Sequence, residues 1–150
     1  EEYALASTLL QTLRAPLYLA VGNRDDRARL RATFVTQDCF PDGEPFVQYA
    51  VEEYAVRLLV LDTQGSGRAG DYCERRAAGL CKVLTQHPGK PVAVFLHHPP
   101  FDISLPSLDN IRLRDVDPLI RVVSIIHHSI SPEPMRLMNF SSNRVRQLSA

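Results

Sequence analysis

Apolar residues occur along this chain in short runs and in helical patterns that are separated by polar loops. Two runs of five residues, Leu17 to Val21 and Val92 to Leu96, have the length of buried strands. Two further strands are predicted at Phe46 to Val51 and at Val56 to Asp62. Because so few residues separate these two, a hairpin is their simplest connection.

Helices are predicted between the strands. Apolar residues recur at helical spacing over residues 4–13, and Pro16 ends that pattern. Asp26 is placed to cap a second helix that runs to about Phe34, and Asp71 can open a third that runs to about residue 84. The alternation of helices and strands predicts an α/β fold, in which helices flank a mixed β-sheet.

The character of the sequence changes after Val123. Residues 124–150 contain Pro132 and Pro134 together with several Ser and Asn residues, and no periodicity is sustained there. We therefore predict a domain over residues 1–123 and a divergent, irregular tail over residues 124–150.

Composition narrows the classes of partner. The chain has 150 residues, of which 45% are apolar, so it can bury the core of one domain. Its 17 Lys and Arg balance 17 Asp and Glu, which argues against nucleic-acid and anionic-membrane partners. No apolar run is long enough to span a bilayer, and Glu1-Glu2 is an atypical start for a signal peptide. We expect a cytoplasmic protein.

Two polar loops each follow a predicted strand. They are Gly22-Asn23-Arg24-Asp25-Asp26 and His97-His98-Pro99-Pro100. Open α/β sheets place their chemistry at the carboxyl ends of their strands. The Asn oxygen and the His nitrogens of these loops are donors that suit a divalent metal.

Both loops can also be explained without a metal. A Gly-Asn pair is commonly a turn, and a His pair before two prolines is commonly part of a loop. We expect Asp25 and Asp26 to cap the following helix and to pair with Arg27 or Arg29. Arg27, Arg29 and Arg31 are expected to form a solvated helix face.

Taken together and in order, these motifs resemble one family. The segment from Val21 to Arg27 is similar to the G-N-H-D-D-R segment of the class III cyclic-nucleotide phosphodiesterases, in the metallophosphoesterase (calcineurin-like) superfamily. Arg24 stands where that segment has His. Leu58 to Thr63 resembles the L-D-T strand of the group, and Leu96 to Phe101 resembles its H-H-P-P loop. The resemblance covers about residues 14–123.

The resemblance implies a fold, a reaction and a set of site residues. The fold would be an incomplete αββα sandwich of the metallophosphoesterase type. The reaction would be hydrolysis of a small phosphodiester or a cyclic nucleotide at a dinuclear centre of Mn, Fe or Zn. Asn23 and His97 would bind metal, because the H-x-P frame of the family selects His97 over its neighbour. Arg24 and His98 are the catalytic candidates, and Arg24 would also bind the substrate phosphate.

The sequence also departs from the family. Its D-x-H, G-D and G-H-x-H motifs are not found, and no Gly precedes His127-His128, which are therefore unfavoured as ligands. A guanidinium at position 24 holds phosphate but does not donate a proton near neutral pH. We accordingly expect this chain to bind metal weakly or not at all and to have little activity.

Two functions remain open at this stage. One is a metal-dependent phosphodiesterase, and the other is a degenerate relative that binds phosphate or a partner without catalysis. A sheet without the first two strands of the family would expose an edge and apolar helix faces, so we also expect a homodimer.

Overall fold

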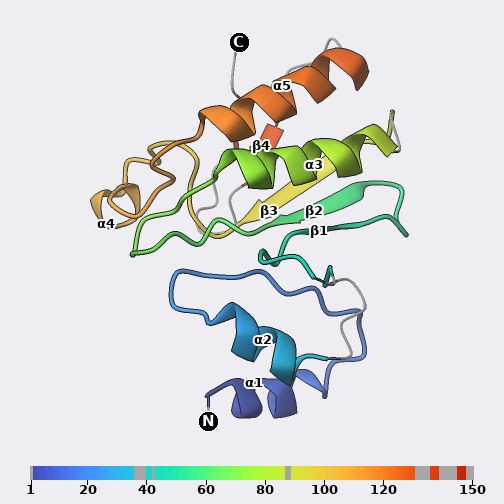
Figure 1. The fold of residues 1–150 in the computed structure, drawn as a ribbon, viewed down its shortest axis with the longest axis vertical. Coiled ribbons are helices and arrows are strands. Elements are labelled where there is room, and N and C mark those ends of the chain that lie inside the picture. The colour runs from blue at the N-terminus through green and yellow to red at the C-terminus, as the bar shows by residue number, and fades with distance from the viewer. Residues whose placement is uncertain are drawn as a thin grey trace.

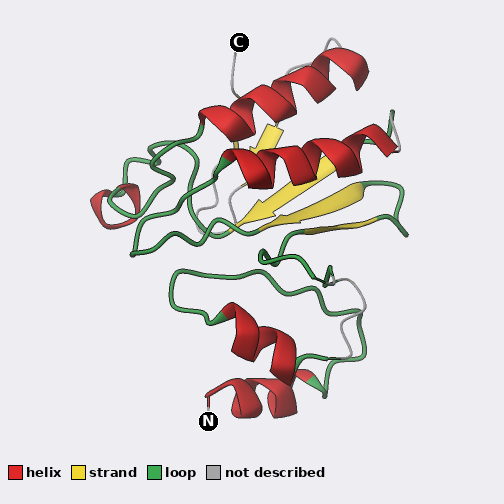
Figure 2. Cartoon of the chain, viewed as in Figure 1, coloured by secondary structure: helices red, strands yellow, loops and turns green. Residues whose placement is uncertain are grey.

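The computed structural model describes residues 2–35, 40–41, 43–86, 89–130, 136–138 and 145–147, with side chains up to residue 124 except at residue 86. Within these ranges the chain forms both helices and strands (Figures 1 and 2). The elements in chain order are α1 (Glu2–Leu10), α2 (Arg27–Thr33), β1 (Tyr49–Val51), β2 (Arg57–Leu61), α3 (Glu74–Gln86), β3 (Val92–Leu96), α4 (Pro106–Asp109), α5 (Asp117–Ile130), β4 (Arg136–Met138) and β5 (Val145–Gln147).

The main sheet has three strands in the order β1-β2-β3. β1 and β2 are antiparallel, so the predicted hairpin is confirmed, and β2 and β3 are parallel. β3 has the bounds that its apolar run predicted, whereas β1 is shorter than the predicted strand. The mixed sheet with its helices is of the predicted α/β class, and the complete sandwich stays a prediction.

The side chains of β2 alternate between two cores on opposite faces of the sheet, as the pleat of a strand requires. Leu59 and Leu61 face a core that is shared with α3 and α5, which lie side by side (Figure 1). Val60 faces a second core that contains Leu30 of α2 and Val21. The three strands therefore form a layer between two helical regions.

One predicted strand is absent. Leu17 to Val21 has no regular secondary structure and pairs with no strand of the described residues, so the prediction of a strand there is wrong. Val21 is fully buried in the core beneath Val60, and the carbonyl of Leu19 accepts a hydrogen bond from the Tyr49 hydroxyl at 2.8 Å. The segment thus lies across the face of the sheet, where side chains reach it but no ladder can form.

The three predicted helices are present, and α2 has its predicted bounds, whereas α1 ends at Leu10 and not at residue 13. Asp26 is the N-cap of α2, and its side chain accepts a hydrogen bond from the backbone N–H of Arg29 at 2.9 Å. α3 begins at Glu74 and not at Asp71. No helix in the described ranges is long and apolar enough to cross a bilayer.

The prediction of irregular structure after Val123 is wrong for part of that segment. α5 continues without interruption to Ile130, because Leu119 and Val122 anchor it in the core beside α3. β4 and β5 form a separate antiparallel pair. A division into two units at residue 123 therefore stays a prediction, and the helix crosses that boundary.

Candidate functional site

The two predicted site loops meet beside the carboxyl ends of β2 and β3. A methyl group built on Gly22 would lie 3.3 Å from Cε1 and 3.4 Å from Nδ1 of His97. The backbone that carries Asn23 therefore lies directly against the His97 ring. Residues that are about 70 positions apart in the sequence share one edge of the fold.

The four predicted site residues differ in their exposure. Asn23 is half-buried, whereas Arg24 and His97 are exposed. His98 is fully buried, and its ring meets the His97 ring edge to face with 4.8 Å between the centroids. A ligand arriving from solvent would thus meet Arg24 and His97 before it met His98.

Both ring nitrogens of His98 are engaged by the protein. Nε2 lies 3.2 Å from the carbonyl oxygen of Arg68, which can only accept, so Nε2 is the donor. Nδ1 then accepts a hydrogen bond from the Thr63 hydroxyl at 2.8 Å. Burial, together with the neighbouring His97, lowers the pKa of His98, which favours this neutral form.

Gly70, in the glycine-rich loop after β2, makes room for the buried histidine. A methyl group built on Gly70 would lie 2.6 Å from Cγ of His98 and 2.8 Å from Cδ2 of Leu113. Its backbone N–H also bonds the carbonyl of Arg112 at 3.1 Å. The absence of a side chain at residue 70 is therefore what lets three segments close around His98.

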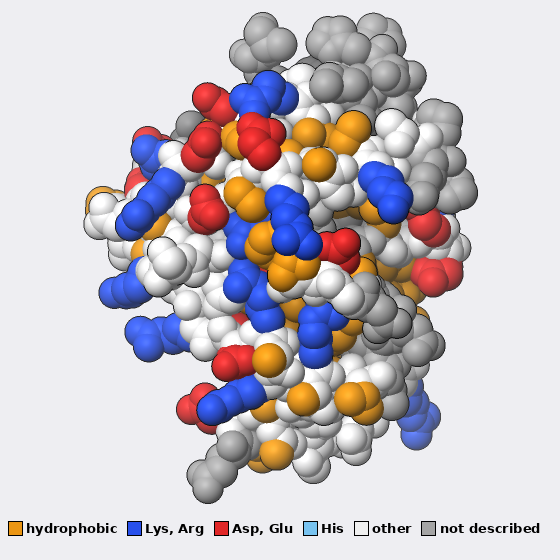
Figure 3. All heavy atoms as spheres, in the orientation of Figure 1, with side chains coloured by type: hydrophobic (Ala, Val, Ile, Leu, Met, Phe, Trp, Pro, Cys, Tyr) orange, Lys and Arg blue, Asp and Glu red, His pale blue; other side chains and the backbone are white. Residues whose placement is uncertain are grey.

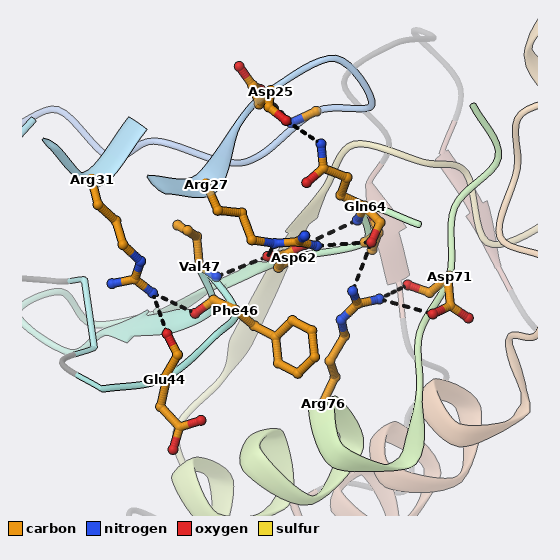
Figure 4. Close-up of polar contacts among 12 residues, drawn as sticks. Asp25, Arg27, Arg31, Glu44, Phe46, Val47, Asp62, Gln64, Asp71 and Arg76 are labelled. Carbon is orange, nitrogen blue, oxygen red and sulfur yellow. Dashed lines mark hydrogen bonds and ion pairs between the residues drawn. The ribbon is translucent and has the colours of Figure 1, made fainter. Parts of the chain in front are cut away.

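A residue to which the sequence assigned no role, Asp62, is the most fully bonded group near the site (Figure 4). It follows β2 and is completely buried. Its Oδ2 accepts from Arg27 Nε at 2.6 Å and from the Val47 N–H at 2.9 Å. Its Oδ1 accepts from Arg27 Nη2 at 2.8 Å and from the Gln64 N–H at 3.1 Å.

The hydrogen-bond donors around Asp62 together affect its pKa more than burial does. Burial alone would raise the pKa of this carboxyl, but the bonds from Arg27, Val47 and Gln64 lower it below its ordinary value. The same contact raises the pKa of Arg27. The sequence could have indicated a role for Asp62, because it is a carboxylate directly after an apolar strand. It could not indicate the partner, Arg27, which is 35 residues away in the sequence.

Gln64 ties the same edge to the loop that carries Asn23. Its side-chain amide donates to the carbonyl of Asp25 at 2.5 Å (Figure 4). The Asp25 carboxylate in turn accepts from the Gly22 N–H at 2.7 Å and from the Tyr3 hydroxyl at 2.8 Å. The loop of residues 22–26 is thus held on both sides, by β2 and by α1.

The prediction of a solvated arginine face on α2 is wrong for two of its three members. Arg27 pairs with Asp62, and Arg31 donates to the carbonyls of Pro41 and Phe46, each at 2.9 Å. Arg29 is exposed, and its ion pair with the capping Asp26 is long, at 3.9 Å. Helical spacing predicted a shared face for these arginines but could not reveal which carbonyls and carboxylates surround it.

The described residues do not complete a metal centre. Within the part of the chain that the structure describes, no group of three or more His, Cys, Asp or Glu side chains is placed to hold a metal ion. The Asn23 oxygen and a His97 nitrogen are two donors, whereas metal sites in proteins usually have about three or four protein ligands. The side chains of His127 and His128 lie outside the described residues.

Comparison with known proteins agrees with the motifs. No protein-family model matches the chain. It is 34% identical over 128 residues to the glycerophosphodiester phosphodiesterase GpdQ of Enterobacter lignolyticus, covering 82% of this chain and 45% of that protein. It is 35% identical over 119 residues to a probable cyclic nucleotide phosphodiesterase of Rhodopseudomonas palustris, covering 77% and 43%. The chain is similar to phosphodiesterases.

A third relative supports the same conclusion. A probable glycerophosphodiester phosphodiesterase GpdQ of Arcobacter nitrofigilis is 32% identical over 110 residues, covering 73% of this chain and 40% of that protein. The chain spans less than half the length of these three curated relatives. The similarity supports the phosphodiesterase resemblance that the two loops indicated.

Proposed function

We propose that this chain is part of a metal-dependent phosphodiesterase that acts on small diesters, cyclic nucleotides among them. The observation that carries the proposal is the contact between Gly22 and the His97 ring. It joins the two segments whose residues resemble ligand loops of the metallophosphoesterases. The similarity to a glycerophosphodiester phosphodiesterase and a probable cyclic nucleotide phosphodiesterase supports the same reaction class.

In this proposal Asn23 and His97 are metal ligands. His97 is exposed, whereas both nitrogens of His98 are engaged, which favours His97 as the ligand. A divalent metal would act as a Lewis acid and would activate water. Because two donors are too few, further ligands would have to come from outside the described side chains.

Arg24 is proposed to bind the substrate phosphate. Its exposed guanidinium can hold two phosphate oxygens at once, whereas guanidinium groups in general are not general acids near neutral pH. For His98, full burial and two hydrogen bonds favour positioning of the 97–98 loop over proton transfer to a substrate.

A second candidate is a phosphate-binding module without catalysis. It is favoured by the combination of an exposed arginine at the position of the family histidine with only two metal donors in the described residues. A homodimer also stays a proposal. It is supported by an exposed apolar face around α1, where Leu5, Leu9 and Leu13 are 62%, 61% and 53% exposed.

The test measures turnover of bis(p-nitrophenyl) phosphate with added Mn²⁺, with and without a chelator. We expect slow turnover that the chelator abolishes and that His97→Ala removes. Arg29→Ala serves as the comparison, since the Arg29 side chain is 78% exposed and is neither a proposed ligand nor a proposed phosphate contact. Turnover that survives both the chelator and His97→Ala would refute the proposal. If there is no turnover but inorganic phosphate binds and Arg24→Ala weakens that binding, the second candidate is supported.

A further inference from the structure

A groove of about 310 Å³ lies away from the two site loops, between α3 and the segment that leads into β1. Phe46 and Gln48 line one wall, and Gly79 and Lys82 of α3 line the other. No residue of the loops 22–26 and 97–98 lines it. Its volume is at the lower end of the range of about 300 to 1,000 Å³ that small-molecule sites occupy.

Gly79 keeps this groove open at a cost to the helix. Glycine in a helix interior is about 1 kcal/mol less favourable than alanine. A methyl group built on Gly79 would meet only Nε2 of Gln48, at 3.5 Å, which is an ordinary van der Waals distance. Packing therefore does not require glycine there, and the missing side chain is what leaves space between α3 and Gln48.

Cations flank the gap that Gly79 leaves. Arg75, Gly79 and Lys82 follow one another at i, i+4 and i+7, so they share one face of α3. The two cations are separated by two helical turns, or roughly 10 Å along the axis. The hydrophobic and basic side chains that gather on this face of the molecule are seen in Figure 3.

The charge of the groove lining is positive. Arg75, Arg76 and Lys82 line it together with the carboxylate of Glu44. Arg75 lies 3.5 Å from Glu44 Oε2 and Arg76 lies 3.5 Å from Asp71 Oδ2, so Lys82 is the lining cation that has no carboxylate partner among the described residues. Arg76 is 4% exposed, and its guanidinium carbon lies 4.3 Å from the centroid of the Phe46 ring (Figure 4). An occupant that matches this lining has an apolar body and a negative charge.

We propose that the groove between α3 and Phe46 binds a small organic anion with an aromatic ring. The ring lies against the apolar lining beside Phe46, and the anionic group lies toward Lys82. The proposal does not depend on phosphodiesterase activity, since the groove shares no residue with the loops that carry Asn23 and His97.

The test compares two probes of nearly equal shape, naphthalene sulfonate and the neutral naphthalene sulfonamide, titrated into the protein by calorimetry. We expect saturable binding of the sulfonate and at least about tenfold weaker binding of the sulfonamide, because only the former complements the cations. Lys82→Gln is expected to weaken sulfonate binding about three- to tenfold and to leave the sulfonamide unchanged.

Gly79→Leu should fill the groove and weaken sulfonate binding at least about tenfold, while leucine also favours the helix. Ala78→Leu is the matched control, because Ala78 is the adjacent exposed residue of α3 and does not line the groove. Circular dichroism confirms that both variants are folded. Absence of saturable sulfonate binding, equal affinity for the two probes, or equal effects of the two leucine variants would each overturn the proposal.

Discussion

We predict that the buried carboxylate of Asp62 is important for the stability of the fold. Each of its two oxygens accepts one guanidinium N–H from Arg27 and one backbone N–H, from Val47 or from Gln64. In the variant Asp62→Asn, one of the two oxygens becomes an amide group. Whichever way the asparagine turns, its NH₂ faces two donors in a site without solvent.

The magnitude follows from the contacts that are lost. Breaking a buried ion pair by removing one partner typically costs about 3 to 5 kcal/mol. Asp62 has no exposed surface, so we expect Asp62→Asn to lower the free energy of unfolding by about 3 to 5 kcal/mol. Arg27→Met leaves the fully buried Asp62 carboxylate without its ion-pair partner, so we expect a cost in the same range, about 3 to 5 kcal/mol.

Urea denaturation followed by far-UV circular dichroism measures these costs. Arg29→Met is the matched control on the same helix, since the side chains of Arg29 and Asp26 are 78% and 54% exposed. An exposed pair of this kind contributes about 0 to 1 kcal/mol, so the control should unfold near the wild-type midpoint.

A double-mutant cycle decides whether the two residues act together. If Arg27 and Asp62 stabilise the fold through their mutual contact, the double variant must lose clearly less than the sum of the two single losses. Additive losses, or an effect of Arg29→Met as large as that of Arg27→Met, would refute the reasoning.

Three further predictions concern the same edge of the sheet. Gly70→Ala should destabilise the protein by about 1 to 3 kcal/mol, because its methyl group would overlap His98, whereas Gly67→Ala, with nothing within 4 Å, should change stability by less than about 0.5 kcal/mol in the same urea assay. Thr63→Val should cost about 1 to 3 kcal/mol, since it leaves the buried Nδ1 of His98 without a donor. Because the folded state lowers the pKa of Asp62, its contribution should be present above the ordinary carboxyl pKa of about 3.9 and should be lost as the pH falls through the lower folded value. Unfolding of Asp62→Asn measured across that range should lack this component of the acid destabilisation.

The local sequence pattern predicted an element correctly where that element depends on contacts between residues close together in the sequence. The run Val92–Leu96 became β3 with unchanged bounds, and the Asp26 cap and the end of α2 at Phe34 are as predicted. These features depend on neighbours within a few residues, which the sequence displays directly.

The sequence pattern gave wrong predictions where a residue or segment contacts a partner that is distant in the sequence. Leu17 to Val21 is as apolar as β3, yet a strand needs a neighbour in the plane of the sheet, and this segment lies across the face instead. Arg27 looked solvated because nothing near it in sequence reveals Asp62. The loops of Asn23 and His97 do lie against one another, but not as the ends of strands in one sheet, because Leu17 to Val21 does not join the sheet.

The alternation of residues after β2 explains how that edge is assembled. Successive side chains of an extended segment point to opposite sides, so Asp62 and Gln64 face one way and Thr63 the other. Asp62 and Gln64 hold the loop of residues 22–26, through the Arg27 side chain and the Asp25 carbonyl. Thr63 holds His98, and β2 and β3 are already aligned at Leu61 and Leu96.

Asp62, Thr63 and Gln64, which directly follow β2, therefore hold both site loops at the end of that strand. None of these hydrogen bonds involves the Asn23 oxygen or the His97 ring, so the hydrogen bonds that hold the loops do not depend on the two proposed donors. These contacts hold the two loops close together, which is the preorganisation that a metal or phosphate site needs. Substitutions at Asn23 or His97 should accordingly leave the unfolding midpoint nearly unchanged, whereas substitutions at Asp62 or Thr63 should lower it. If His97→Ala destabilised the protein as much as Thr63→Val, the loops would depend on the proposed donors for their positions, and this account of the edge would fail.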